Sequence, residues 1–184
     1  MQAQAQGNFP WLPAASVASE TVEQATPVPA GFMRMKVDRN SFAAYLRRLP
    51  LLPKGSKVLL FDGREKPYQA GAYRVMNIDI GTRDLQQCAD AIMRLKAEYH
   101  YERQEYAKIH FNYTSGTRVS FDDWRYGKKP IVSGKTVSFS KGTGAPNNSY
   151  ANFKKYLQNI YTFAGTASLE KELQRVPRMA DIQA

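Results

Sequence analysis

The stretch Tyr73–Tyr113, YRVMNIDIGTRDLQQCADAIMRLKAEYHYERQEYAKIHFNY, decides the expected fold, because it predicts a strand, a turn, a long helix and a second strand. Side chains of residues 73–80 alternate between two faces, which is typical of a β-strand with one buried face. Gly81 and Thr82 end this strand. The carboxylate of Asp84 can then cap the helix, since it accepts unpaired N–H groups and lies at the positive end of the helix dipole.

The helix that follows has two contrasting faces, because its apolar residues recur at about 100° per residue. The apolar face is expected to be buried and contains Leu85, Cys88, Ala89, Ile92, Leu95 and Tyr99. The opposite face carries Gln87, Asp90, Arg94 and Glu98. Arg94 lies within ion-pair reach of both carboxylates, so this face predicts a ladder of ion pairs that is exposed to water.

The chain has 184 residues and a net charge of +10. This length suffices for one domain with its own core, and the charge favours anionic partners. Residues 1–30 contain Glu20 and Glu23 but no Lys or Arg, and they lack apolar periodicity. We therefore predict a flexible leader over residues 1–30 and a single α+β domain over residues 31–184, which carries the excess of positive charge.

Short elements on both sides of the central stretch complete the pattern. Helices are predicted at about residues 42–49, 150–164 and 167–176, and strands at residues 57–61, 109–113, 118–121 and 136–139. Residues 124–129 (WRYGKK) are expected to form a turn, and the aromatic cluster around Trp11 to dock onto its own domain. The predicted fold is α+β, with a mainly antiparallel sheet, a long central helix and C-terminal helices.

Several classes of protein do not fit the composition. One cysteine cannot form an internal disulfide, and two histidines do not complete the ligand set of a closed zinc site. No apolar run approaches the roughly 20 residues of a membrane-spanning helix. The loop GTGAPNNS at residues 142–149 lacks the Gly-Lys-Ser/Thr ending of a phosphate-binding loop. We expect no metal, no cofactor and no transmembrane segment.

Cys88 and His110 are the candidate nucleophile and base of a papain-like cysteine hydrolase or amidase acting on cell-wall peptides. In such enzymes a helix N-terminus favours the thiolate, and a strand histidine takes its proton. Asn112 is poorly placed to orient His110 from two residues along the same strand. In the alternative interpretation, which we expect to hold, Cys88 is packed on the apolar helix face and closed to water.

A binding site is the first functional hypothesis. If the aromatic turn covers the polar helix face, Arg94 becomes a donor fork for a carboxylate or a phosphate. The candidate ligand-binding residues are Gln87, Asp90, Arg94, Glu98, Trp124, Arg125 and Tyr126. Nucleic-acid binding through the basic surface is a further alternative, although the chain has no helix-turn-helix, zinc knuckle or RNA-recognition motif.

The run DLQQCADAIMRLKAEYHY, which starts at Asp84, resembles a bacterial family of unknown function, domain of unknown function 4846. Members share DLQQCADA, then RLxAEY, then an I-x-F-x-F/Y-T-S-G strand, here residues 109–116. The resemblance extends to SFAAYLRRLPL and SYANFKKYLQNIYTFAGTASLEKEL, and so covers nearly all of residues 31–175. It implies no activity and no catalytic residues.

Members of that family are usually exported or lipid-anchored envelope proteins. The resemblance therefore implies an envelope or secreted protein whose export signal is absent from this chain, with a cytoplasmic location as the alternative. Together with the basic charge and the polar helix face, this predicts a domain of the bacterial cell envelope that binds an anionic or glycan ligand of the cell-wall type. Whether it is also an enzyme stays open.

Overall fold

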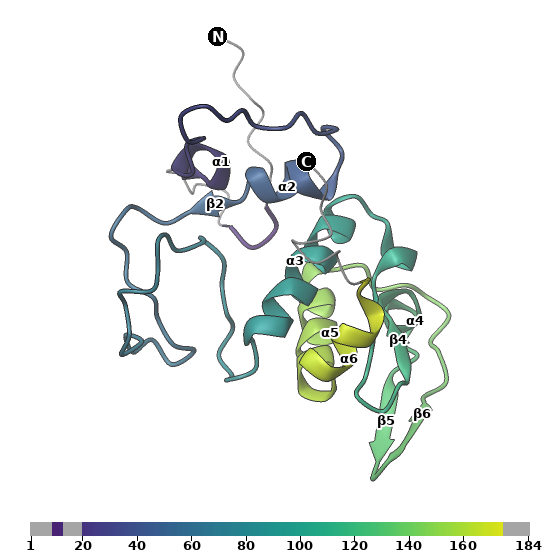
Figure 1. Ribbon diagram of the computed structural model, residues 1–184. Helices are drawn as coiled ribbons and strands as arrows, with labels where there is room; N and C mark the ends of the chain where they lie inside the picture. The colour runs from purple at the N-terminus through teal and green to yellow at the C-terminus, as the bar shows by residue number, and fades with distance from the viewer. Residues whose placement is uncertain (1–8, 13–19, 175–184) are drawn as a thin grey trace. The chain divides into compact units, whose positions relative to one another are not determined.

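The computed structural model describes residues 9–12 and 20–174 and shows an α+β chain (Figure 1). Its contacts divide it into two compact units, residues 1–86 and residues 87–184. The described strands pair as two-stranded antiparallel sheets, so the predicted α+β class with antiparallel pairing is confirmed. The predicted division into a leader over residues 1–30 and a domain over residues 31–184 stays a prediction.

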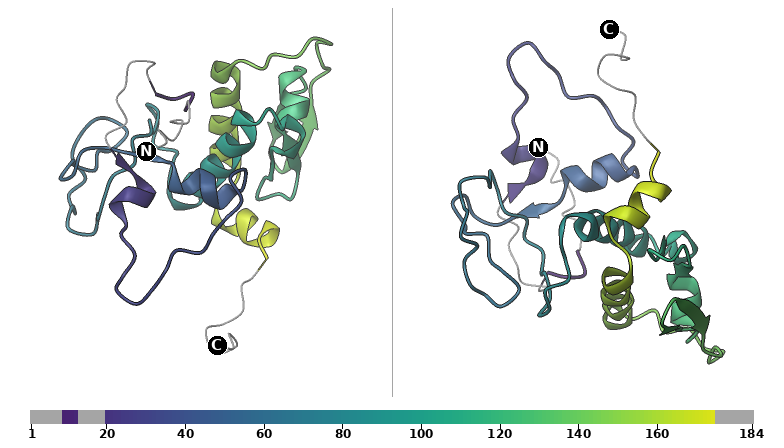
Figure 2. Two further views of the ribbon diagram at one scale, coloured as in Figure 1. Left: turned by 90° about the horizontal axis from the view of Figure 1, so that it is seen from above. Right: turned by 60° about the horizontal axis from the view of Figure 1, so that its bottom comes forward.

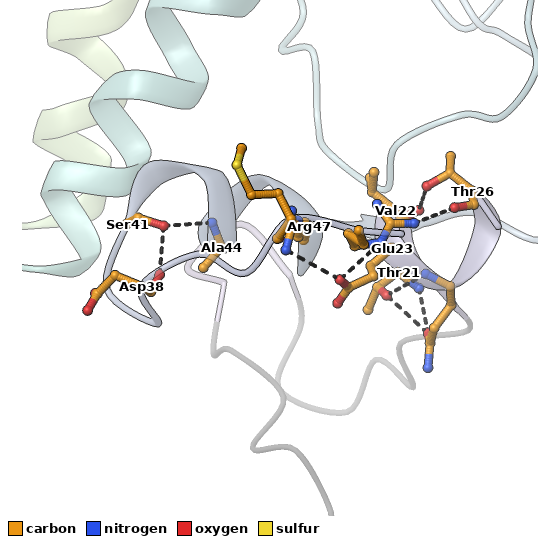
Figure 3. Close-up of polar contacts among 11 residues, drawn as sticks. Thr21, Val22, Glu23, Thr26, Asp38, Ser41, Ala44 and Arg47 are labelled. Atoms are coloured by element: carbon orange, nitrogen blue, oxygen red, sulfur yellow. Dashed lines mark hydrogen bonds and ion pairs between the residues drawn. The ribbon is translucent and has the colours of Figure 1, made fainter. Parts of the chain in front are cut away.

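The regular elements of the first unit are short. They are β1 (Glu20–Thr21), α1 (Val22–Ala25), α2 (Phe42–Arg47) and β2 (Pro50–Leu51). Ser41 caps α2, as its sequence predicts (Figure 3). β1 and α1 fall within the predicted leader, yet Thr21 and Gln24 form a capping box and β1 pairs with β2. A cap and a pairing partner therefore give this segment a structure that apolar periodicity does not reveal.

The strand predicted over residues 73–80 is wrong. The segment makes one isolated antiparallel bridge, between Met76 and Leu51. The opposing segment has few N–H groups to continue the ladder, because Pro50 and Pro53 flank its two leucines. Leu52 donates its backbone N–H to the Val75 carbonyl oxygen at 2.9 Å, but Pro50 has no N–H to return the hydrogen bond that it accepts from Asn77. Alternating polarity is thus not enough for a strand where the partner lacks donors.

The strand predicted over residues 57–61 is likewise reduced to one bridge, between Leu59 and Glu65. Asp62 and Gly63, a pair that prefers tight turns, form a turn with Gly63 at a φ of 84°, which favours glycine. Much of the first unit after β2 is therefore irregular backbone.

The aromatic residues near the start of the chain pack inside the first unit. Phe9 is buried, and its ring centroid lies 4.8 Å from that of Trp11 and 5.9 Å from that of Tyr45. The indole N–H of Trp11 donates to the Asn77 carbonyl oxygen at 2.8 Å. The predicted docking of this cluster onto its own chain is confirmed for these two aromatic residues.

The second unit contains the longer elements. They are α3 (Cys88–Glu102), the 3-10 helix η1 (Tyr106–Lys108), β3 (His110–Asn112), β4 (Arg118–Ser120), α4 (Phe121–Arg125), β5 (Pro130–Ser133), β6 (Thr136–Phe139), α5 (Tyr150–Phe163) and α6 (Thr166–Glu172). β3 with β4 and β5 with β6 form antiparallel pairs. The strands predicted at residues 109–113 and 118–121 pair as a hairpin, and the helix predicted at residues 150–164 is confirmed. The helix predicted at residues 167–176 forms but ends at Glu172, and residues 175 and 176 lie outside the described residues. Part of the predicted turn at residues 124–129 instead belongs to α4, because Ser120 caps that helix by accepting the Asp123 N–H at 3.0 Å.

An aromatic core holds the second unit together. Figure 2 shows α5 beside α3, with the β5–β6 hairpin extending away from these helices. The buried aromatic side chains of this core are Phe111, Tyr113, Phe121, Trp124, Phe153 and Tyr156. The rings of Phe121 and Phe153 meet edge to face at 5.3 Å, a favoured geometry for aromatic pairs. This packing fixes α4 and α5 against one another and so positions the polar residues described next.

Candidate functional site

The start of α3 differs from its prediction. The helix begins at Cys88, not at Leu85, and Gln87 takes the N-cap position expected for Asp84. The carboxylate of Asp90 accepts the backbone N–H of Gln87 at 3.1 Å, so the acid inside the first turn satisfies the cap. Burial raises the pKa of Asp90, with its hydrogen bonds acting in the opposite direction.

The buried face of α3 is largely not the predicted one, although Ala89 is buried as expected. Asp90, Arg94 and Glu98 expose only 6%, 3% and 1% of their surface, whereas Ile92 exposes 53% and Cys88 is exposed. The predictions of a water-facing ion ladder and of a buried Cys88 are therefore wrong. Apolar residues occur on nearly every side of this helix, so hydrophobic periodicity does not select one face.

A buried ion pair and a tyrosine form the centre of the candidate site. The Nε of Arg94 lies 3.4 Å from Oε1 of Glu98, one helical turn away, which confirms the predicted pairing. The hydroxyl of Tyr150, at the start of α5, donates to the same Glu98 oxygen at 2.6 Å. Burial and the Glu98 charge raise the pKa of Tyr150, so the neutral phenol remains a donor. A charge-assisted hydrogen bond thus joins α3 to α5.

A second connection joins α3 to α4 through the loop that precedes α5. The hydroxyl of Tyr101 donates to the Asn148 carbonyl oxygen at 2.6 Å, and burial is the main cause that raises the pKa of Tyr101 to about 12. A guanidinium nitrogen of Arg125 donates to the Asn148 side-chain oxygen at 3.1 Å. Arg125 is also paired with Asp122 at 2.7 Å, so its charge is already compensated within α4.

Lys129 lies against the aromatic turn without a carboxylate partner. Its Nζ is 3.6 Å from the centroid of the Trp124 ring and 3.3 Å from Oδ1 of Asn152. No ion pair in residues 9–12 and 20–174 includes Lys129 or Lys155. Burial, together with the charge of Lys155, lowers the pKa of Lys129 to about 8. Among the described residues, an indole face and an amide oxygen are thus the groups that stabilise this partly buried cation.

The first turn of α5 connects the two predicted halves of the site. Glu98 from the polar helix face accepts from Tyr150, and Trp124 from the aromatic turn donates to Asn152 at 3.1 Å. Ser149 caps this turn by accepting the Asn152 N–H. The structure therefore connects the polar helix face and the aromatic turn through α5. The sequence did not indicate that α5 contacts both.

The predicted ligand-binding residues differ in how accessible they are. Trp124 is buried with Asp90, Arg94 and Glu98, so these side chains support the site from inside. Tyr126 is 37% exposed, and the Arg125 guanidinium lies 4.4 Å from the centroid of its ring.

A known protein family includes this chain. Residues 22–184 match domain of unknown function 4846. The chain belongs to this family. The match includes all of the second unit and most of the first, in agreement with the resemblance found on the DLQQCADA motif. The chain matches no curated protein and no solved structure.

The structure of this member of domain of unknown function 4846 describes no contact between Cys88 and His110, the candidate nucleophile and base. Cys88 is the exposed first residue of α3, and His110 lies in β3 opposite Ser120. The Nδ1 of His110 is buried without a hydrogen-bond partner, and burial, together with the Arg118 charge, lowers the pKa of this histidine. In the described part of the chain, no hydrogen bond links the Cys88 thiol to the His110 imidazole.

Lys129, Tyr150 and Asn152 are the site residues that sequence reasoning missed. The apolar spacing of residues 150–164 indicates that Tyr150 faces the core, but not that its hydroxyl meets Glu98. Ser120 followed by Asp123 is a helix-start signal that predicts α4. A helix at this position turns Trp124 toward the core. No local signal indicates that Lys129 lacks a carboxylate partner, because that depends on elements distant in sequence.

Two further features are absent from the described part of the chain. No three His, Cys, Asp or Glu side chains there gather in a way that could hold a metal ion. None of the helices there combines the length and the apolar character that a bilayer span requires.

Proposed function

We propose that the second unit is a binding module for an anionic ligand, a carboxylate- or phosphate-bearing glycan of the cell-wall type. The observation that carries this proposal is the environment of Lys129, a partly buried cation beside Lys155 without a carboxylate partner. Removing a charge from water without an opposite charge costs free energy, and a bound anion offsets that cost. An anionic ligand therefore completes the environment of this side chain.

The local charge supports the same conclusion. Residues 121–155 contain seven Lys or Arg, two Asp and no Glu. Both acids are engaged within the segment, Asp122 with Arg125 at 2.7 Å and Asp123 with Lys128 at 3.1 Å. The remaining cations leave a positive field that attracts anions and speeds their association.

A glycan is favoured among anions because an aromatic ring accompanies the cations. Tyr126 is 37% exposed, and aromatic faces stack against the apolar faces of sugar rings while charged groups hold the acid. With such a ligand, the protein acts in the cell envelope or outside the cell. Fractionation of the producing cells, followed by immunoblotting, checks this location.

The buried network has a supporting role in this proposal. Arg94 exposes 3% of its surface, so it does not contact the ligand. Instead, Glu98 and Tyr150 fix the first turn of α5, which presents Asn152 to Lys129. The binding contact thus moves from Arg94, the residue expected from the sequence, to Lys129.

A charge-matched pair of variants tests the proposal. Calorimetric titration of the full chain with polygalacturonate, a carboxylate glycan, and with polyphosphate measures affinity for both acid types. Lys129→Met is expected to weaken binding about 10-fold or more, since a hydrogen bond to a charged group contributes about 1.5–3 kcal/mol. Lys135→Met removes the same charge from the exposed turn between β5 and β6 and is expected to have little effect.

Equal losses in the two variants would mean diffuse attraction by net charge, and the proposal would fail. A single-stranded oligonucleotide in the same titration separates the nucleic-acid alternative. If the chain binds the oligonucleotide more tightly than it binds polygalacturonate and polyphosphate, and loses that affinity steeply on added salt, the nucleic-acid alternative is favoured.

The pH dependence of binding gives an independent test. Because the pKa of Lys129 is about 8, the wild type is expected to lose affinity between pH ~7 and ~9 as this side chain becomes neutral. Lys129→Arg stays charged over that range and is expected to keep its affinity. Because the pKa of Lys129 is lower in the folded chain than in the unfolded chain, the unfolded chain holds this proton more tightly. The contribution of Lys129 to folding stability therefore rises with pH between about 8, the pKa in the folded chain, and 10.5, the ordinary pKa of a lysine.

A further inference from the structure

The α1–α2 loop, residues 26–41 of the first unit, exposes three large apolar side chains. Phe32, Met33 and Met35 expose 76%, 92% and 76% of their surface. Single apolar residues on a surface are ordinary, but a cluster within four positions is the kind of patch that marks an interaction site.

The α1–α2 loop is held in place by two arginines, Arg34 within the apolar cluster and Arg47 on α2. Glu23 on α1 pairs with Arg34 at 3.4 Å and with Arg47 on α2 at 3.8 Å (Figure 3). Arg34 also donates to the Thr26 carbonyl oxygen at 2.5 Å, and Arg47 donates to the Met35 carbonyl oxygen at 2.9 Å. The backbone beside the exposed side chains is therefore anchored to both flanking helices.

The charge of the α1–α2 loop complements an anionic surface. Lys36 and Arg39 are exposed, and neither takes part in an ion pair within the described residues. Residues 27–37 contain no acid, and Asp38 accepts the backbone N–H of Asn40 at 2.7 Å. The apolar cluster is thus followed along the chain by two exposed cations, Lys36 and Arg39, that no described carboxylate neutralises.

The path of the loop suits a flat partner. Figures 1 and 2 show it arching outward from α1 and α2, so its tip is convex. Convex apolar tips enter the boundary between the headgroups and acyl chains of a bilayer, while nearby cations meet the lipid phosphates. We propose that the α1–α2 loop docks this protein on a membrane surface rich in anionic lipids.

Co-sedimentation of the full chain with vesicles tests the proposal. Vesicles of phosphatidylglycerol mixed with phosphatidylcholine are expected to bind on the order of 10-fold tighter than vesicles of phosphatidylcholine alone. The triple variant Phe32→Ser, Met33→Ser, Met35→Ser is expected to lose on the order of 10- to 100-fold in affinity for the anionic vesicles.

Two control variants locate the effect. The double variant Ile131→Ser, Val132→Ser removes exposed apolar side chains from β5 and is expected to bind like the wild type. Lys129→Met is also expected to keep vesicle binding, which separates this surface from the proposed glycan site. Wild-type binding by the triple variant, or loss of binding in either control, overturns the proposal.

A fluorescence measurement reports on insertion without removing the apolar cluster. In a Cys88→Ser background, an environment-sensitive dye at Met33→Cys is expected to shift to the blue on anionic vesicles. The same dye at Ser133→Cys, an exposed position at the end of β5, is expected to remain unshifted. An unshifted dye at position 33, or equal shifts at both positions, contradicts insertion of the loop.

Discussion

Glu98 is a buried carboxylate whose charge is compensated by neighbouring side chains. It exposes 1% of its surface, and a lone carboxylate at such a position is strongly disfavoured. Arg94 supplies the opposite charge and Tyr150 supplies a hydroxyl donor, so the cost of desolvation is offset locally. The three side chains therefore act as a unit, in which removing the carboxylate takes away the opposite charge that Arg94 pairs with.

Glu98→Ala is expected to lower the free energy of unfolding by about 3–5 kcal/mol, because it leaves the Arg94 charge buried without its partner. Tyr150→Phe is expected to cost less, about 1.5–3 kcal/mol, since only the hydroxyl donor is lost. Urea denaturation followed by circular dichroism measures both. Glu102→Ala, an exposed acid on the same helix, is the control and should change stability by less than about 0.5 kcal/mol. A cost for Glu98→Ala as small as that of the control would show that the ion pair is not buried in solution.

Cys88 is expected to react with a thiol reagent in the folded protein, because the structure exposes this residue at the start of α3. Labelling with 5,5′-dithiobis(2-nitrobenzoate), with and without denaturant, measures the accessibility of the thiol. Complete reaction under native conditions supports the exposed position. Protection until the protein unfolds would restore the sequence-based expectation of a packed cysteine. Tests of the hydrolase alternative then compare wild type with Cys88→Ala on peptidoglycan.

At the scale of elements, α5 is the centre of the second unit. Ser149 starts it at the predicted position, and its first turn accepts contacts from both α3 and α4. Its buried residues Phe153, Leu157 and Ile160 follow the predicted helical spacing. α3 behaves differently, because the helix forms in the predicted stretch but starts three residues later and buries a face other than the predicted one. A strongly amphipathic helix can thus be oriented from sequence, whereas a helix with apolar residues on most sides cannot.

At the scale of the whole molecule, the two compact units differ in regularity. The second unit contains helices of 15 and 14 residues, α3 and α5, whereas the longest helix described in the first unit is α2, with 6 residues. Amides in long helices over a buried core exchange slowly, and amides of irregular exposed segments exchange quickly.

Hydrogen exchange followed by mass spectrometry is therefore expected to show slow exchange in peptides from α3 and α5. Peptides from residues 53–74 are expected to exchange much faster, because this segment is largely exposed and has few backbone hydrogen bonds. The comparison is internal to one sample and needs no variant. Equal protection in the two regions would contradict the difference in regularity between the units.

The sequence by itself determined the family, the α+β class, the hairpin over residues 109–121 and the extent of α5. These features depend on local signals, namely a shared motif, alternation along a strand and a serine cap. Only the tertiary structure decided which face of α3 is buried, that residues 73–80 form no strand, and that Lys129 pairs with no carboxylate among the described residues. The physical reason is that burial of a charge depends on partners far away in the chain. Tyr150 lies 52 positions from Glu98, and no periodicity within α3 reports its presence.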